Sequence, residues 1–253
     1  MRVDLNADIG EFSSIHDAER DRRLLRTITS GNIACGFHAG DPNVMRHTIQ
    51  QAARAGVAVG AHPSFRDVEG FGRREMRLEG EEITELVVHQ VAELAAIARA
   101  EGVALRHVKP HGALYNMGAR DKDIAEAIAS AVASLDATLR LVGLPGSQLL
   151  SAGMRMGLPV AAEGFADRSY EADGSLTPRH IAGAVLTESA PVAERAVRMV
   201  RDGRVVARDG TTLSLKVDTI CVHGDTPGAA ELAEAVRAGL EAAGVTVAPL
   251  GDW

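Results

Sequence analysis

The chain has 253 residues, a formal net charge of −7 and an isoelectric point near 5.7. This length is typical of a single (β/α) barrel, and we expect one domain over residues 1–253. The negative charge and the scattered arginines argue against a nucleic-acid-binding protein, which requires a basic face. No apolar run approaches the ~20 residues of a membrane helix, so we expect no membrane partner.

The cysteine usage and the N-terminus indicate a cytoplasmic protein. Cys35 and Cys221 each lie inside a strand-like apolar run, and two buried thiols suit a reducing compartment better than a disulfide framework. Residues 1–4 begin directly as a strand pattern, without the charged and then apolar segment of a secretion signal.

Strand-like and helix-like segments alternate from end to end, which predicts parallel strands with right-handed helical crossovers. The expected strands cover residues 3–7, 32–37, 57–61, 105–109, 139–143, 159–163 and 218–222, and residues 245–248 are a further short candidate. The expected helices cover residues 17–29, 42–55, 79–101, 121–134, 147–156, 178–187, 190–202 and 226–243.

Local signals mark several of these boundaries. A capping side chain precedes a proline at Asp41-Pro42, Thr177-Pro178 and Thr226-Pro227, which predicts three helix starts. Residues 204–207 and 212–215 flank Asp209-Gly210 and predict a small β-hairpin before the last strand of the set.

Polar and ionisable residues gather where the predicted strands end. The active site of a parallel barrel is assembled at the C-terminal ends of its strands, whereas an open sheet places its ligand mainly at one switch point. The alternatives are an irregular seven-stranded barrel and an open doubly wound sheet. The spread of polar residues over many strands favours the barrel and an enzyme.

The first predicted strand is unusually polar. Asp4, Asn6 and Asp8 share one face by period-two alternation, and Glu11 follows in the next loop. Three polar inward positions make a poor core strand and a good source of a general base or a metal ligand.

Histidines follow four other strands. His38 and His223 each stand in a strand–His–x–Gly–Asp or strand–His–Gly–Asp turn that leads through Asp41 or Asp225 to a proline. Helix capping explains the aspartates and turns explain the glycines, but neither explains a histidine at both strand ends. The other two histidines that end strands are His62 and His111.

Cationic residues accompany them. Lys109 is an inward residue at a strand end, where it requires a partner or a solvated cavity. Arg73 and Arg74 lie in a long glycine-rich loop and are suited to clamp a carboxylate or phosphate, although a solvated surface loop explains them equally well. After the sixth strand, Glu163 and Asp167-Arg168 fit either a site or a structural ion pair.

Common nucleotide and nucleophile motifs are absent from the sequence. It contains no G-x-x-x-x-G-K-[ST] loop, no G-x-G-x-x-G after a strand and no G-x-S-x-G elbow. The glycine turn at residues 143–147 precedes a helix and is a weak candidate for an anion site.

In these motifs the chain resembles the LamB/YcsF family of lactam utilisation proteins. The resemblance rests on segments that span nearly the whole chain in order, with no visible departure: residues 4–11, 33–42, 60–63, 70–74, 108–115, 163–168, 176–179 and 221–225. It implies an irregular seven-stranded (β/α) barrel like that of polysaccharide deacetylases. It also implies ATP-dependent opening of 5-oxo-L-proline to L-glutamate, with ATP as co-substrate and two other 5-oxoprolinase subunits as partners.

Chemical roles can be assigned on that basis. Opening a phosphorylated lactam needs a base for water, cations for phosphate and carboxylate, and a proton donor to the ring nitrogen. We assign Asp8 or Glu11 as the base, His62 or His111 as the proton carrier, and Lys109 to the phosphorylated oxygen. Arg73 or Arg74 would hold the substrate carboxylate. Further substrate or phosphate contacts are expected from Asn6, His38, His223 and Asp225.

Two alternatives remain open at this point. The first is a metal-dependent amide hydrolase or deacetylase, whose divalent cation would take ligands from Asp8, His38, His62, His111 and His223. Against it, the H-E-x-x-H spacing of a single-helix metal motif is absent. The second is a non-catalytic subunit that activates its partners. The sequence leaves a homo-oligomer open.

Overall fold

The computed structural model describes residues 1–12, 19–224 and 228–251. Within them, seven parallel strands form a closed barrel, because the last strand of the set pairs with both the sixth and the first. The barrel strands are β1 (Arg2–Ile9), β2 (Ser30–Ala34), β3 (Ala58–His62), β4 (Leu105–Val108), β5 (Arg140–Gly143), β6 (Val160–Phe165) and β9 (Thr219–Val222). The predicted closed barrel is confirmed, and the open sheet is excluded.

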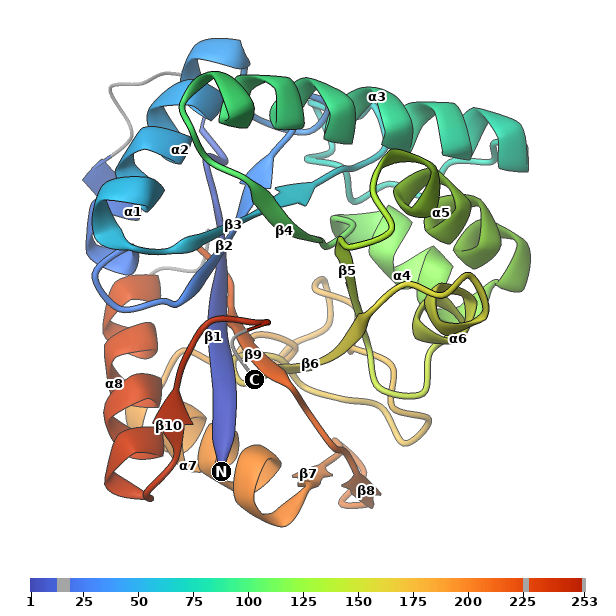
Figure 1. The fold of residues 1–253 in the computed structure, drawn as a ribbon. Coiled ribbons are helices and arrows are strands. Elements are labelled where there is room, and N and C mark those ends of the chain that lie inside the picture. Colours follow the sequence, from blue (N-terminus) through green and yellow to red (C-terminus); the bar gives the residue numbers. More distant parts are fainter. Residues whose placement is uncertain (13–18, 225–227, 252–253) are drawn as a thin grey trace.

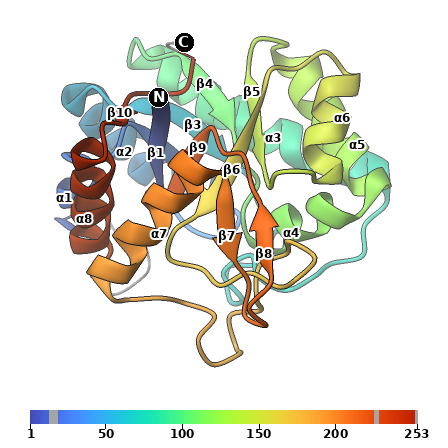
Figure 2. The same cartoon turned by 90° about the horizontal axis from the view of Figure 1, so that it is seen from below.

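Helices surround the barrel (Figure 1). They are α1 (Glu19–Leu24), α2 (Pro42–Ala55), α3 (Gly80–Ala100), α4 (Gly112–Arg120), α5 (Lys122–Leu135), α6 (Gln148–Arg155), α7 (Ser189–Asp202) and α8 (Ala229–Ala242). The helices α7 and α8 pack against each other in both ribbon views (Figures 1 and 2). Among the described helices, none has the length and apolar character required to cross a membrane.

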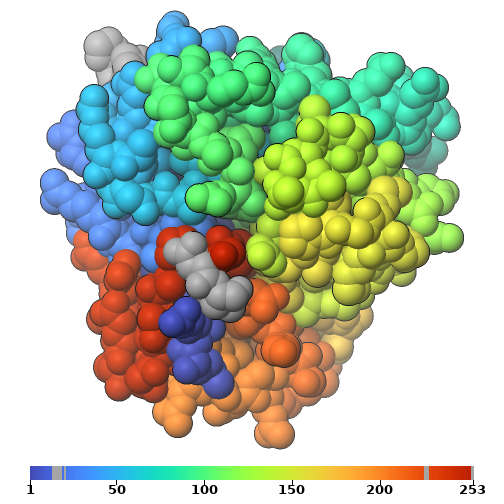
Figure 3. All heavy atoms as spheres, in the orientation of Figure 1, coloured from blue at the N-terminus to red at the C-terminus, as the bar shows by residue number. Residues whose placement is uncertain are grey.

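The first strand of the barrel and the last described strand lie side by side. The short strand β10 (Thr246–Val247) pairs in parallel with the start of β1, which confirms the additional strand at the C-terminus. The space-filling view shows the N-terminal residues beside the C-terminal part of the chain (Figure 3). The hairpin of β7 (Arg204–Val206) and β8 (Thr212–Ser214) is also confirmed.

Several predicted helix boundaries hold and others do not. Asp41 caps α2 by accepting hydrogen bonds from the amides of Asn43 at 2.7 Å and Val44 at 2.9 Å. The predicted helix at 17–29 ends earlier than expected, since α1 ends at Leu24, and residues 17–18 lie outside the described residues. The predicted start at Thr226-Pro227 and the site candidate Asp225 lie outside the described residues.

The helix predicted at residues 178–187 is wrong, because its expected cap is used elsewhere. The Thr177 hydroxyl donates to Glu171 Oε1 at 2.7 Å, and the Thr177 carbonyl accepts a hydrogen bond from Arg168 at 2.6 Å. The segment therefore folds back on the end of β6 as turns. Conversely, sequence patterns did not reveal α4, which begins directly after His111 and carries two glycines.

Two different cores flank β1. Val3, Leu5 and Ile9 are fully buried in the apolar layer between the strands and the helices. Asp4, Asn6 and Asp8 alternate with them, and their side chains bond across the barrel interior to other strands, as period-two alternation predicts. The interior of the barrel is therefore polar.

A glycine makes room for one of the interior groups. Gly60 on β3 stands opposite His107 on β4, and a Cβ added at Gly60 would lie 2.1 Å from His107 Nε2. Atoms of the ring would have to move, and the surrounding strands leave the ring little space because His107 is only 1% exposed. Gly60 is thus required by close packing rather than by backbone conformation.

We predict that Gly60→Ala lowers the free energy of unfolding in urea by about 1–3 kcal/mol, the range for overpacked interiors. Gly80→Ala is the matched control, since an added Cβ there meets nothing closer than 4.0 Å and alanine favours the helix. Equal stability of the two variants would show that the His107 ring can move aside without a cost in free energy.

Candidate functional site

The ammonium of Lys109 lies inside the barrel, just beyond the end of β4. Its Nζ is 2.9 Å from Asp8 Oδ1, 2.9 Å from Glu163 Oε1 and 3.1 Å from Cys221 Sγ. Burial acts to lower the pKa of Lys109, but the charges around it outweigh burial and hold the pKa well above its ordinary value. Burial likewise acts to raise the pKa of Asp8, whereas His62 and Lys109 bring it well below its usual range. The two groups form a buried ion pair.

Asparagine amides position the carboxylates of this ion pair. Asn32 Nδ2 donates to Asn6 Oδ1 and to Asp8 Oδ1, both at 2.8 Å, and its own Oδ1 accepts from His107 Nε2 at 2.7 Å. Asn6 Nδ2 donates in turn to Glu163 Oε1 at 3.0 Å. Sequence reasoning missed Asn32 and His107, although His107 shares a strand face with Lys109 by simple alternation.

A further polar layer lies deeper in the barrel. Asp4 accepts hydrogen bonds from Thr29 at 2.7 Å, Ser30 at 2.6 Å and Thr219 at 2.5 Å. Burial raises the pKa of Asp4 to about 6, and these hydroxyls limit the rise. Asp4 supports the site through Thr219, which accepts a hydrogen bond from Asn6 at 2.7 Å.

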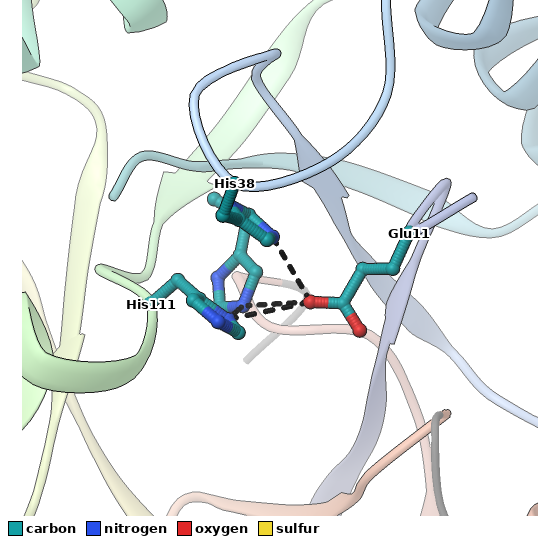
Figure 4. A group of neighbouring side chains, drawn as sticks. Glu11, His38 and His111 are labelled. Atoms are coloured by element: carbon teal, nitrogen blue, oxygen red, sulfur yellow. Dashed lines mark hydrogen bonds and ion pairs between the residues drawn. The ribbon is translucent and has the colours of Figure 1, made fainter. Parts of the chain in front are cut away.

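Three histidines from three different strand ends meet around Glu11. Glu11 Oε1 lies 3.0 Å from His38 Nε2, 3.3 Å from His111 Nδ1 and 3.9 Å from His62 Nε2. His62 Nε2 and His111 Nδ1 are 2.9 Å apart. Figure 4 shows Glu11 pointing toward His38 and His111 from the end of β1. We call Glu11, His38, His62 and His111 the histidine cluster.

The histidine cluster is suited either to hold a proton or to ligate a divalent cation. Its four members offer ligand atoms that all lie within 4.8 Å of one another. Burial lowers the pKa of His38, and burial with the neighbouring histidines His38 and His62 lowers the pKa of His111 well below its usual value. The rings of His38 and His111 are therefore neutral at physiological pH, the form that binds metals.

A histidine–aspartate pair borders the ion pair on the other side. His223 Nδ1 lies 3.0 Å from Asp167 Oδ2, and the His223 amide donates to the same oxygen at 3.1 Å. Burial acts to raise the pKa of Asp167, but His223 outweighs it and the pKa lies below its usual value. Asp8, Cys221 and His223 form the second group of ligand-type atoms within 4.8 Å.

The loop after β3 covers the histidine cluster. The Phe71 ring packs edge-on against His38 and His111, with centroids 5.4 and 5.3 Å away. Phe71 has φ +55°, and Gly72, at φ +65°, leaves only 2.9 Å between an added Cβ and the His111 ring. With its cover in place, the site is enclosed: His223, its most exposed histidine, is only 8% exposed.

The structure places the predicted arginines on or near this cover. Arg74 is paired with Asp67 within the loop, and its side chain is 60% exposed. Arg73 lies over the Phe71 ring, with its guanidinium carbon 4.8 Å from the centroid. Burial and then the positive charges of Arg179 and Arg73 lower the pKa of Arg168 to about 10, so these three guanidiniums gather beside the site.

This arrangement defines a parallel barrel whose C-terminal strand ends carry a buried ionisable centre. The LamB/YcsF family model matches residues 3–253, and the chain belongs to the LamB/YcsF family. It is 55% identical to a protein of Chloroflexus aggregans that is named as a subunit of 5-oxoprolinase, over 98% of both chains.

Solved structures agree with the fold. The lactam utilization protein of Thermus thermophilus superposes with a TM-score of 0.92 at 46% identity, covering 99% of this chain and 100% of that one. The catalytic domain of a peptidoglycan N-acetylglucosamine deacetylase from Eubacterium rectale has a TM-score of 0.52 at 12% identity, covering 99% of this chain and 88% of that one. The latter match shows the fold alone, which is the predicted deacetylase-like barrel.

His107 makes a testable contribution to the pH dependence of stability. Burial, and then the charges of Lys109 and His62, lower its pKa from 6.5 to about 3. The unfolded chain therefore binds the proton more readily than the folded chain. The neutral His107 therefore contributes its full share to the free energy of unfolding above pH 6.5, and this share is lost as the pH falls toward 3.

We predict that His107→Gln, which keeps a donor for Asn32 but cannot titrate, loses less stability than the wild type on acidification. Between pH 7 and pH 3, the wild type should lose at most about 4–5 kcal/mol more of its free energy of unfolding than His107→Gln loses. Urea unfolding at several pH values measures it, and the comparison cancels the contributions of Asp4 and the other acids. Parallel stability curves would contradict a histidine held neutral by burial.

Proposed function

We propose that this chain is the lactam-opening component of an ATP-dependent 5-oxoprolinase. It acts in the cytoplasm on 5-oxo-L-proline and yields L-glutamate, together with two other subunits and with ATP as co-substrate. The names of its relatives support the class of substrate. The buried, free Cys35 and Cys221 agree with a reducing compartment.

One observation carries the proposal: the Asp8–Lys109 ion pair, with Glu163 Oε1 2.9 Å from the ammonium, stands beside neutral histidines at the covered end of the barrel. Such a centre combines fixed charge, proton acceptors and exclusion of bulk water. These are the requirements for attack of water on an activated amide carbon. A purely structural barrel would fill the same positions with aliphatic side chains.

The chemistry divides between activation and opening. A five-membered lactam is a stable amide, and transfer of a phosphoryl group from ATP to its oxygen turns that oxygen into a leaving group. Water then adds to the ring carbon, the carbon–nitrogen bond breaks, and the nitrogen takes up a proton, which leaves an acyl phosphate. A second water displaces phosphate from that acyl carbon and yields the carboxylate of glutamate. The barrel supplies the second stage, and the partner subunits complete the first.

Lys109 and Asp8 have separate roles in this proposal. The Lys109 ammonium already contacts Asp8, Glu163 and Cys221, so it keeps Asp8 ionised and supplies positive charge next to the reacting oxygen. Asp8 Oδ1 is occupied by Lys109 and Asn32, which leaves Oδ2 to receive the proton of the attacking water.

The proton for the ring nitrogen fits His223. Its Nδ1 is held by Asp167, which leaves Nε2 to exchange a proton with the substrate, and His223 belongs to the group with Asp8 and Cys221 whose ligand-type atoms lie within 4.8 Å of one another. We add His223 in this way to His62 and His111, the proton carriers assigned from the sequence, whose outer nitrogens lie against backbone carbonyls. Arg73, which lies over the Phe71 ring of the cover, remains assigned to the substrate carboxylate.

We predict that Lys109→Met and Asp8→Asn each reduce glutamate formation by the assembled three-subunit enzyme about 100-fold or more. Lys122→Met is the control, because that lysine is a surface residue with 65% side-chain exposure. Circular dichroism and co-purification with the partners verify folding and assembly. Near-normal turnover of both folded site variants would favour a non-catalytic, activating role.

We also predict that the isolated chain hydrolyses little ATP, even with 5-oxoproline present. It lacks a P-loop, and its glycine turn at residues 143–147 carries no lysine for a phosphate. Adding the partner subunits should convert ATP cleavage into stoichiometric glutamate release, measured by coupled phosphate and glutamate assays. Strong 5-oxoproline-dependent ATPase activity of this chain alone would reverse the assigned division of labour.

A further inference from the structure

The hydrogen bonds on the outer side of the histidine cluster fix the tautomer of each ring. His62 Nδ1 lies 2.6 Å from the Lys109 carbonyl, and His111 Nε2 lies 2.8 Å from the Phe71 carbonyl. A carbonyl oxygen only accepts, so each of these nitrogens carries the hydrogen.

The third ring is fixed through a serine. The Ser64 hydroxyl donates to the Phe65 carbonyl at 2.9 Å, so its oxygen is left to accept from His38 Nδ1, also at 2.9 Å. Gln90 holds Ser64 in turn, since it bonds both the amide and the carbonyl of Ser64 at 3.0 and 2.9 Å. In the neutral form, all three rings therefore carry their hydrogen on the outer nitrogen.

The inner nitrogens consequently present lone pairs to one another and to a carboxylate oxygen. His62 Nε2 and His111 Nδ1 face each other at 2.9 Å, with Glu11 Oε1 3.9 and 3.3 Å away. His38 Nε2 lies 3.0 Å from the same oxygen. Four electron-pair donors that converge without a hydrogen between them repel one another, and a cation at their centre removes that repulsion.

The spacing matches one class of cation. Four ligands at 2.0–2.1 Å around a tetrahedral ion are separated by about 3.3–3.4 Å. The four measured separations in the histidine cluster, from 2.9 to 3.9 Å, bracket that edge length. Outer N–H groups held by carbonyl or hydroxyl oxygens are also what metal-ligating histidines show.

We propose that His38 Nε2, His62 Nε2, His111 Nδ1 and Glu11 Oε1 bind one divalent first-row transition metal ion, for which Zn²⁺ is the probe. Imidazole nitrogen with a single carboxylate suits zinc and its neighbours better than magnesium or calcium. This differs from the ligand set considered from the sequence, because Glu11 joins the cluster while Asp8 and His223 stand outside it.

The second group of ligand-type atoms does not compete. Asp8 and Cys221 are already bridged by the Lys109 ammonium, at 2.9 and 3.1 Å, so a cation of the protein itself occupies that place. Burial also raises the pKa of the Cys221 thiol well above its usual value, which disfavours the thiolate that a metal requires.

Metal binding by the histidine cluster does not depend on the lactam activity. When bound, such an ion lowers the pKa of a coordinated water and so supplies hydroxide at neutral pH. Asp8 Oδ2, 3.5 Å from His62 Nε2, stands at the edge of the cluster toward the ion pair. The chain's own carboxylate is thus placed to accept a proton at the border of the metal site.

The test is metal binding by the full-length chain, stripped with a chelator and then titrated with Zn²⁺ or Co²⁺. We expect one ion per chain after gel filtration, by elemental analysis. The Co²⁺ form should show the intense visible bands of a tetrahedral site and no sulfur-to-metal charge-transfer band. Glu11→Gln, which preserves shape, and Ser64→Ala, which releases His38, should weaken Zn²⁺ binding by at least ~10- to 100-fold.

Cys221→Ser and His223→Asn are the matched controls, since they alter the second group and should retain Zn²⁺ binding. Thermal unfolding supplies an independent readout, because Zn²⁺ should raise the Tm of the wild type and of both controls but not that of Glu11→Gln. Failure of the wild type to retain Zn²⁺ or Co²⁺ would overturn the proposal. A sulfur charge-transfer band, or equal loss in the controls and in Glu11→Gln, would also overturn it.

Discussion

The structure depends on one buried positive charge. Lys109 is only 2% exposed, and two carboxylates and a thiol surround its ammonium. Transfer of isolated charges from water into a protein costs several kcal/mol each, and only a fully satisfied network offsets that cost. The polar residues of the barrel interior form that network, so the interior that other barrels fill with aliphatic layers is here committed to holding a charge.

The two oxygens of each carboxylate in this network accept hydrogen bonds from different donors. Glu163 receives Lys109 and Asn6 on Oε1 and the Tyr115 hydroxyl on Oε2 at 2.9 Å, so it is fully used for support. Asp8 receives Lys109 and Asn32 on Oδ1 but has Oδ2 turned toward His62 at 3.5 Å. Asp8 therefore links the ion pair to the histidine cluster.

Sequence patterns were sufficient for features with a regular period or a local signal. The polar face of β1 followed from alternation, and the start of α2 followed from Asp41-Pro42. The helix expected after Thr177 failed because that capping signal is local, whereas Thr177 is used by Arg168 and Glu171 in a tertiary contact. Alternation alone left a barrel and an open sheet possible, the polar strand ends favoured the barrel, and the family resemblance implied the same fold.

The sequence predicted the histidines of the site, but not the group to which Glu11 belongs, nor Asn32 and His107. Histidines at strand ends placed three of the four cluster members in one candidate set, together with His223 and Asp8, but nothing local distinguishes Glu11 as their companion from Asp8, three residues earlier on the chain. Asn32 and His107 were missed because an amide and an imidazole within short strands carry no signal until the strands are paired. Their importance arises from register, which places Asn32 beside Asp8 and Gly60 beside His107.

The cover over the histidine cluster has a consequence for access. Phe71 adopts φ +55°, a left-handed conformation that costs a bulky residue about 1–3 kcal/mol. The same residue's carbonyl holds His111 in its tautomer. The backbone of Phe71 and the orientation of His111 are therefore coupled, since any change in that backbone would also move the carbonyl that accepts from His111. Access to the histidine cluster from this side and the orientation of His111 thus depend on the same short loop.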